Sequence, residues 1–295
     1  MKSIPLKFLA PLGVSVLFAS NTYAALIASD SFTTVGADAY VDDRLYGQSP
    51  TTGTNGFSGD TAWNGNFNTG DVEIDSTGLS ASLAVAPTGS SVITDGASSD
   101  RTVSRTFSSF TPTDETYYYS FLVYVNPDGT ANRSAFGLAV QDLSANYSNP
   151  QTGVMVSLEG ASGTAGAYSD LNLWVAGVSY DFSADLATGS TYYALVQIDN
   201  STTGDDLITA NLYASTATDF SNSLSTASAT GEISSQLSSL TVLQDFGGTG
   251  TLFDEFYLGT ALSDVSSTVI PEPSAFALFA GFLILSISLA RRRRS

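Results

Sequence analysis

The sequence predicts an all-β protein, an antiparallel β-sandwich of jelly-roll type. Short apolar or alternating runs follow one another along most of the chain, separated by turns rich in Gly, Asn, Asp, Ser and Thr. No amphipathic helical pattern lies between these runs. About 245 residues remain when an apolar segment is set aside at each end, which suits one large β-domain.

The first 24 residues have the pattern of an export signal. Lys2 and Lys7 give a basic start, residues 8–18 are apolar, and Thr22-Tyr23-Ala24 ends in a small residue. We therefore predict a signal peptide over residues 1–24, cut after Ala24 and read by the Sec export machinery. The alternative is an uncleaved membrane anchor, which the short apolar run disfavours.

Residues 117–125, with the sequence YYYSFLVYV, form the clearest strand. Alternation places Tyr119 and Phe121 on one face and Leu122 and Tyr124 on the other. Because both faces are largely apolar, we expect a central strand that is covered on both sides. Further strands are expected at residues 26–28, 31–32, 79–85, 102–107, 135–140, 154–158, 171–178, 192–198, 207–213, 240–243 and 252–258. Residues 215–241, about half Ser and Thr, are interpreted as a long surface excursion.

Several of these stretches are similar to one known group of domains. An opening Asp30-Ser31-Phe32, the strand pair 192–198 and 207–213, and the closing stretch FDEFYLG at residues 253–259 resemble concanavalin A-like, laminin-G-type jelly rolls. Laminarinase-like enzymes of that fold carry Glu-x-Asp-x-x-Glu on one strand, and this pattern does not occur here. No catalytic residue is therefore predicted, and hydrolysis is the least favoured function.

The C-terminal residues have the pattern of a membrane-spanning segment. Residues 275–290 carry no charge and are followed by Arg291, Arg292, Arg293 and Arg294. A helix of this length spans roughly 24 Å, close to the ~30 Å hydrocarbon core, and arginine stems extend its reach. The arginine cluster should stay cytoplasmic. A buried core helix is the alternative, which the terminal arginines disfavour.

The preceding Pro271, Glu272 and Pro273 complete a three-part pattern. Residues 270–295 resemble the PEP-CTERM sorting signal of Gram-negative bacteria. The resemblance implies an exosortase-type processing enzyme that cleaves near these three residues. We then expect residues 25–268 to form the ectodomain and residues 269–295 the sorting signal, with a transmembrane helix at about 274–290. The protein would be held transiently in the inner membrane and then reach the cell envelope or the exterior.

Charge and composition exclude several functions. The predicted ectodomain has four arginines against 27 acidic residues, a net charge of −23. Because phosphate binding needs basic surface, no nucleic-acid partner is expected. The chain has no Cys and no His, which excludes disulfides, His-based triads and His-ligated zinc within it.

Three groups of residues are candidate sites. Asp199, Asp205 and Asp206 lie in one hairpin loop and could hold Ca²⁺, although an ordinary polar turn fits as well. Asp254 and Glu255 should point to opposite faces of a strand and so cannot act as a pair.

The two tryptophans differ in their surroundings. Trp63, in a polar loop, is the candidate for glycan contact, whereas Trp174, in an apolar strand, is expected in the core. These observations favour a non-catalytic exported envelope or matrix protein, whose partner is either exopolysaccharide or another envelope component. The alternative is a calcium-assisted, lectin-like module.

Overall fold

The structure is a computed structural model of the 295-residue chain. It describes residues 25–41, 44–57, 61–65, 72–85, 89–94, 101–107, 115–126, 133–139, 153–160, 168–201, 203–233, 237–244 and 250–267. The predicted signal peptide, residues 1–24, and the predicted sorting signal with its helix at 274–290 lie outside these ranges. Within them, no helix has the length and apolar character needed to cross a membrane.

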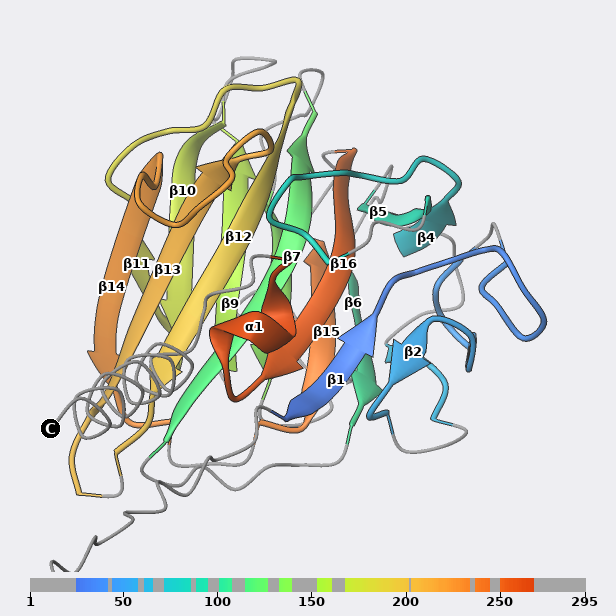
Figure 1. Cartoon of the computed structure of the whole chain (residues 1–295), viewed down its shortest axis with the longest axis horizontal. Helices are drawn as coiled ribbons and strands as arrows, with labels where there is room; N and C mark the ends of the chain where they lie inside the picture. The colour runs from blue at the N-terminus through green and yellow to red at the C-terminus, as the bar shows by residue number, and fades with distance from the viewer. Residues whose placement is uncertain are drawn as a thin grey trace, which may run out of the picture.

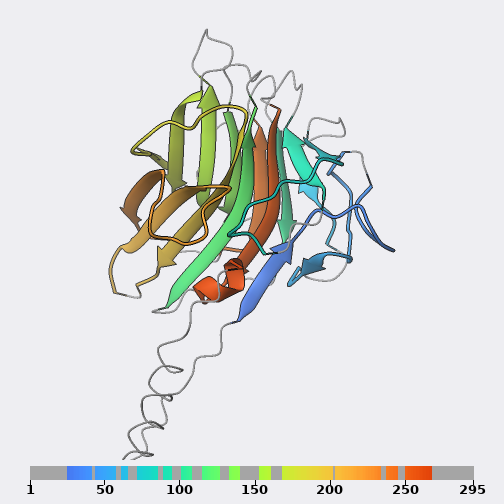
Figure 2. The ribbon, with the colours of Figure 1, turned by 45° about the horizontal axis from the view of Figure 1, so that its top comes forward.

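The strands form two antiparallel sheets that pack face to face as a β-sandwich (Figures 1 and 2). The path through the first sheet is β14 (Ser225–Gly231), β13 (Asp206–Ala214), β12 (Ser190–Asp199), β7 (Thr116–Val125), β16 (Thr251–Gly259), β1 (Leu26–Asp30) and β2 (Thr54–Asn55). Two further strands branch from β16: β5 (Ser91–Thr94) pairs with it, and β4 (Val72–Asp75) pairs with β5.

The described part of the second sheet has seven strands. Their order is β11 (Val178–Asp181), β10 (Tyr168–Val175), β9 (Gly153–Gly160), β8 (Arg133–Ala139), β15 (Ser239–Gln244), β6 (Arg101–Thr106) and β3 (Asn64–Gly65). One short helix, α1 (Leu262–Val265), follows the last strand. The all-β, two-sheet prediction is confirmed.

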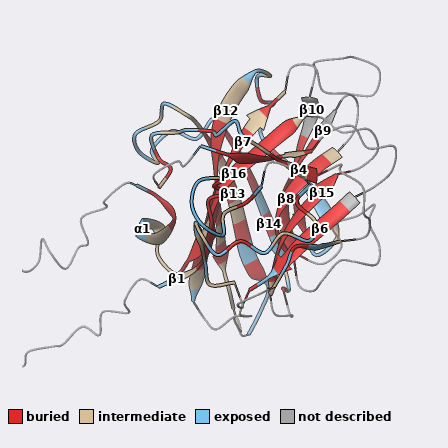
Figure 3. Cartoon of the chain, turned by 90° about the vertical axis from the view of Figure 1, so that its right-hand side faces the viewer, coloured by how far each residue is buried: buried red, intermediate tan, exposed pale blue. Residues whose placement is uncertain are grey.

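The main core lies between the sheets (Figure 3). Phe136 of β8 packs at its centre, with ring centroids 4.8 Å from Phe121 of β7 and 5.0 Å from Phe253 of β16. β7 pairs with β12 on one side and β16 on the other, so the prediction of a central strand is confirmed.

The outer face of the first sheet carries a second apolar cluster over β7, β12 and β16, where Leu122 is fully buried. Helix α1 is held against this face because Ser120 and Tyr193 both donate side-chain hydrogen bonds to the Val265 carbonyl, at 2.7 and 2.6 Å. Residues 79–85 also contribute to the cluster as turns and irregular chain. The prediction of a strand there is wrong because these apolar residues cover a sheet and do not pair in one.

Residues 215–241 are also not one surface excursion, because they contain β14 and the start of β15. In β14 the small residues Ala227 and Ala229 face the core, while Ser228 and Thr230 are exposed. The strand was missed because alanine gives a weak apolar signal, although the alternation itself is regular.

Candidate functional site

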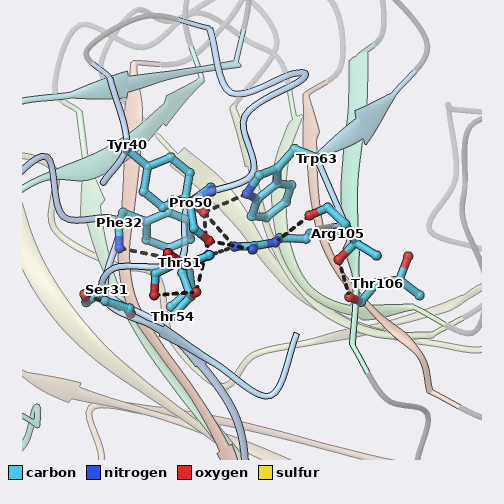
Figure 4. Close-up of polar contacts among 12 residues, drawn as sticks. Ser31, Phe32, Tyr40, Pro50, Thr51, Thr54, Trp63, Arg105 and Thr106 are labelled. Carbon is cyan, nitrogen blue, oxygen red and sulfur yellow. Dashed lines mark hydrogen bonds and ion pairs between the residues drawn. The ribbon is translucent and has the colours of Figure 1, made fainter. Parts of the chain in front are cut away.

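Trp63 lies in a buried polar network, shown in Figure 4. Its side chain is 1% exposed, and its Nε1 donates a 2.7 Å hydrogen bond to the Tyr40 hydroxyl. That hydroxyl donates in turn to Asp30 Oδ2 over 2.5 Å. The Trp63 ring packs near Phe32, with centroids 6.2 Å apart. In this structure the Trp63 indole presents no exposed face to a sugar, so its geometry does not support the predicted glycan contact.

The same network joins the two sheets. Arg105 of β6 places its Nη1 3.4 Å from Asp30 Oδ2 of β1, and both side chains are almost fully buried. Arg105 also donates from Nη2 to the Pro50 carbonyl at 2.7 Å and from Nε to the Thr61 carbonyl at 3.0 Å. Burial raises the pKa of Asp30 to about 6, although the Tyr40 hydrogen bond and the Arg105 charge lower it. These contacts make the network a structural link between the sheets.

The predicted calcium loop does not form a cluster of carboxylates. Asp206 is 2% exposed, and its Oδ1 accepts from the Ser201 amide while its Oδ2 accepts from the Ile233 amide, both at 2.8 Å. Asp199 Oδ1 accepts the Thr116 hydroxyl at 2.7 Å. Among the residues that the structure describes, no group of three acidic side chains could hold a metal ion. Asp199, Asp205 and Asp206 are therefore not brought together.

Asp254 and Glu255 do not alternate across the sheet as predicted. The register of β16 against β7 shifts between Asp254 and Tyr257, and Glu255 has a φ of 54°. This bulge buries both carboxyl groups, with the Tyr257 hydroxyl donating to Glu255 Oε2 at 3.2 Å. Burial, and next the Glu255 charge, raise the pKa of Asp254. Asp254 Oδ2 accepts from the Leu79 amide at 2.8 Å, which ties the covering segment to β16.

The outer face of the second sheet brings together aromatic, amide and hydroxyl groups. Register aligns its positions into two neighbouring rows across five strands: Trp174, Met155, Gly137, Thr241 and Ser104 in one, and Asn172, Ser157, Ala135, Leu243 and Thr102 in the other. The positions between them in sequence, such as Leu173 and Val242, belong to the main core. Strand alternation therefore separates a mainly apolar inner face, which also carries Arg105 and Ser134, from a mixed outer face.

Trp174 is the aromatic centre of this outer face. Its burial confirms the prediction for this residue, but it lies in a small separate cluster and not in the main core. Its Nε1 donates to Ser157 Oγ at 2.9 Å, and the Arg133 guanidinium lies 4.8 Å from its ring centroid. The cation and the hydrogen bond fix the plane of the indole.

Two hydroxyls on this face have no hydrogen-bond partner among the residues that the structure describes. Thr102 Oγ1 of β6 and Thr241 Oγ1 of β15 are both buried, and they occupy diagonal positions on paired strands. Leaving such a group unsatisfied costs about 1–3 kcal/mol, so each one calls for an explanation, such as a bound water or ligand.

Chemically, the described side chains of this face can hydrogen-bond and stack but include no carboxylate pair. Sequence reasoning missed the face because Trp174 alone looked like a core residue. The signal that could have found it is the alternation in residues 170–175, where Asp170, Asn172 and Trp174 alternate with apolar residues. The orphan hydroxyls depend on the pairing of β6 with β15, which the sequence does not show.

No protein-family model matches the chain, and no curated protein sequence does. Among solved structures, the chain is similar to the T. cruzi calreticulin globular domain, with a TM-score of 0.45 and 11% identity over 68% of this chain and 85% of that one. It is also similar to an endo-β-1,4-glucuronan lyase from the fungus Trichoderma reesei, with a TM-score of 0.41 and 13% identity over 78% and 98%.

A third similar structure is domain 4 of a GH43 extracellular arabinanase from Geobacillus stearothermophilus, in complex with arabinotriose. Its TM-score is 0.40, with 18% identity over 85% of this chain and 96% of that one. At these scores the likeness carries no argument about what this chain binds or catalyses.

Proposed function

We propose that this chain is an exported cell-envelope protein whose β-sandwich binds carbohydrate on the outer face of the second sheet, without cleaving it. The observation that carries the proposal is the pair of buried, unpartnered hydroxyls of Thr102 and Thr241. Sugar hydroxyls both donate and accept hydrogen bonds, so a glycan would satisfy both threonines. Trp174 on the same face is buried as well, and its ring becomes an aromatic contact for a glycan only when the face opens.

The burial of this face bears on the kinetics of binding. Thr102 is 2% exposed and Thr241 is 0% exposed, so a glycan reaches them only through a change of conformation. We therefore expect association below the usual range of about 10⁵–10⁷ M⁻¹s⁻¹.

The test replaces each orphan hydroxyl by a methyl group in the full-length protein, as Thr102→Val and Thr241→Val. Each variant should lose glycan binding on an array and gain about 1–2 kcal/mol of stability, because a buried unsatisfied group is removed. Thr94→Val is the matched control: its buried hydroxyl is bonded to Ser134 Oγ at 2.9 Å, so this change should destabilise the fold. Unchanged glycan binding by both threonine variants would refute the proposed site.

Two additional arms separate the alternatives for the same face. Repeating the array in EDTA tests the calcium-assisted alternative, for which binding should fall with chelation. Incubating the protein with a β-glucan panel tests hydrolysis, and the appearance of new reducing ends would contradict a purely binding role.

Delivery to the envelope is supported by the sequence alone, through the export-signal pattern of residues 1–24 and the sorting-signal pattern of residues 270–295. If an exosortase-type enzyme processes the chain, mass spectrometry of the mature envelope protein should find a C-terminus near Pro271, Glu272 and Pro273. Mature protein that still carries Arg291 and the three arginines after it would argue against processing.

A further inference from the structure

Beyond the apolar cluster and α1, the outer face of the first sheet carries described side chains of β7, β12, β13 and β14 that are not fully buried (Figure 1 labels these strands). Six side chains there are intermediate or exposed, and we refer to them as the polar platform. They are Tyr118, Gln197, Thr209 and Ser228 in one row, and Asn211 and Thr226 in the next. Strands lie about 4.8 Å apart, so the first row spans roughly 14 Å.

This part of the sheet is almost uncharged in a strongly acidic protein. The predicted ectodomain has 27 acidic residues. Yet at the described outward-facing positions of β12, β13 and β14, Asp199 is the one charged residue, and none is basic. Solvated faces normally carry many charged side chains, so this composition indicates a surface that binds a ligand.

We infer that the polar platform is a second binding site, which takes an uncharged polysaccharide chain. Two of its amides are already held in place: Gln197 Nε2 donates to both Asp199 carboxylate oxygens at 3.0 and 2.9 Å, and Thr226 Oγ1 donates to Asn211 Oδ1 at 2.8 Å. Gln197 Oε1 and Asn211 Nδ2 remain as an acceptor and a donor for sugar hydroxyls.

Tyr118 of β7 ends the row; its ring packs partly against the apolar cluster, and the part that stays exposed can contact a sugar. Burial, and then the Asp199 charge, raise the pKa of its hydroxyl, which therefore stays neutral over the physiological range. The held amides, the hydroxyls of Thr209 and Ser228, and one aromatic ring reduce the entropy cost of holding an extended polymer.

Other occupants fit this surface less well. A polyanion would meet Asp199 with no compensating cation among the described outward-facing residues of these strands. A second copy joining at the β14 edge would have to displace the Ser183 amide from the Thr226 carbonyl, a 3.0 Å hydrogen bond. Joining through the face itself would bury serine, which protein interfaces disfavour.

The platform belongs to the first sheet, whereas the face in the proposed function is the outer face of the second. The two sites therefore lie on opposite sides of the sandwich. If the proposed function also holds, one molecule would bridge two polysaccharide chains, as a matrix cross-linker does. The platform itself does not depend on the second-sheet site.

The experiment is affinity electrophoresis of the full-length protein in a sugar-free, non-ionic detergent. Gels contain either hydroxyethylcellulose, as the uncharged probe, or alginate, as the anionic probe. The double variant Thr209→Val with Ser228→Ala keeps the β-strand shape and removes two hydroxyls, and Tyr118→Leu removes the ring. Thr218→Val, at an exposed threonine off the platform, is the matched control.

Wild type should be retarded by hydroxyethylcellulose and not by alginate. Both platform variants should lose about tenfold in affinity, the equivalent of one or two hydrogen bonds, while Thr218→Val should bind like wild type. Equal retardation of the platform variants and wild type, or stronger retention on alginate, overturns the inference. So does a concentration-dependent dimer in sedimentation that the platform variants abolish.

The double variant Thr102→Val with Thr241→Val separates this inference from the proposed function. If it alone abolishes retardation, the platform inference fails and the proposed function stands. If only the platform variants abolish it, the platform stands and the proposed function fails for this polymer.

Discussion

The Tyr40 hydroxyl is the polar atom through which three buried side chains meet. It donates to Asp30, accepts from Trp63 Nε1, and lies 3.5 Å from Arg105 Nη1. The Asp30–Arg105 contact is long for an ion pair, so the hydroxyl bears part of the stabilisation of the buried carboxylate. One phenol therefore connects β1 of the first sheet to β6 of the second.

Replacing this hydroxyl gives a prediction at the residue scale. Tyr40→Phe leaves the Trp63 N–H buried without a partner and deprives Asp30 of its shortest hydrogen bond, so the free energy of unfolding should fall by about 2–3 kcal/mol. The pKa of Asp30 should rise further, because the Tyr40 hydrogen bond lowers it. Urea unfolding measures the first effect.

Tyr46→Phe is the matched control, since Tyr46 is half-buried and no hydrogen bond to its hydroxyl is found in the described structure. It should be nearly neutral. Equal losses for the two variants would show that the network is not what stabilises this region.

The burial of Trp63 was not predictable from its own surroundings. Its loop is rich in Gly and Asn, which is typical of exposed chain. Its side chain contacts Phe32 and Tyr40, which are distant in sequence, and Tyr40 in turn contacts Asp30 of β1 and Arg105 of β6. Trp174 was predictable, because its neighbours Leu173 and Val175 alternate with it in a single strand.

At the element scale, alternation predicted most of the long strands, including β7, β9, β12, β13 and β16. It failed for residues 79–85, where apolar side chains serve to cover a sheet, and for β14, where alanine replaces larger residues. It also failed inside β16, because the bulge at Asp254 and Glu255 interrupts the alternation of faces. Its mark in the sequence is the spacing of the core residues Phe253 and Phe256, which lie three positions apart and not two.

Gly56 follows β2, which pairs with β1, and its substitution can be compared with that of Gly189 elsewhere in the chain. Gly56 has a φ of +77°, and a Cβ there would lie 1.9 Å from the Ile27 carbonyl oxygen. Gly189 has a similar φ of +73°, but a Cβ there would meet nothing within 4 Å. Gly189→Ala should therefore cost only the backbone strain, about 1–2 kcal/mol.

Gly56→Ala should cost that strain and a further ~1–3 kcal/mol, because the β1–β2 pairing must move apart. Thermal unfolding of the two variants provides the comparison. A Gly56 variant no less stable than the Gly189 variant would contradict the close approach of the two segments.

At the scale of the whole molecule, the acidity was easy to predict from the sequence, whereas the candidate site was not. A charge of −23 over the predicted ectodomain is a count, whereas the rows of the second-sheet face arise only when five strands align. The burial of three acidic side chains could not be predicted from the sequence either. Asp30, Asp254 and Glu255 are all at most 1% exposed, although composition alone would place them in solvent.

These buried carboxyl groups determine how stability should depend on pH. The pKa of Asp30 is raised from 3.8 to about 6 in the folded chain, and the pKa of Asp254 is raised as well. Between the unfolded and folded values, the native state binds protons that the unfolded chain releases. The free energy of unfolding should therefore increase as the pH falls from about 7.5 to about 5, with Asp30 alone contributing about 1 kcal/mol. The same stabilisation disappears when the pH is raised through 6, where the folded Asp30 loses its proton.

General charge repulsion predicts the same direction, so the measurement needs a second variable. Repulsion among exposed acids is screened at about 1 M salt, where the Debye length is about 3 Å, whereas buried groups are screened much less. Urea unfolding at the two pH values, in low and high salt, separates the two causes. If buried carboxyls dominate, most of the gain at lower pH persists in high salt. If the gain disappears there, surface repulsion is its source and the buried acids contribute little.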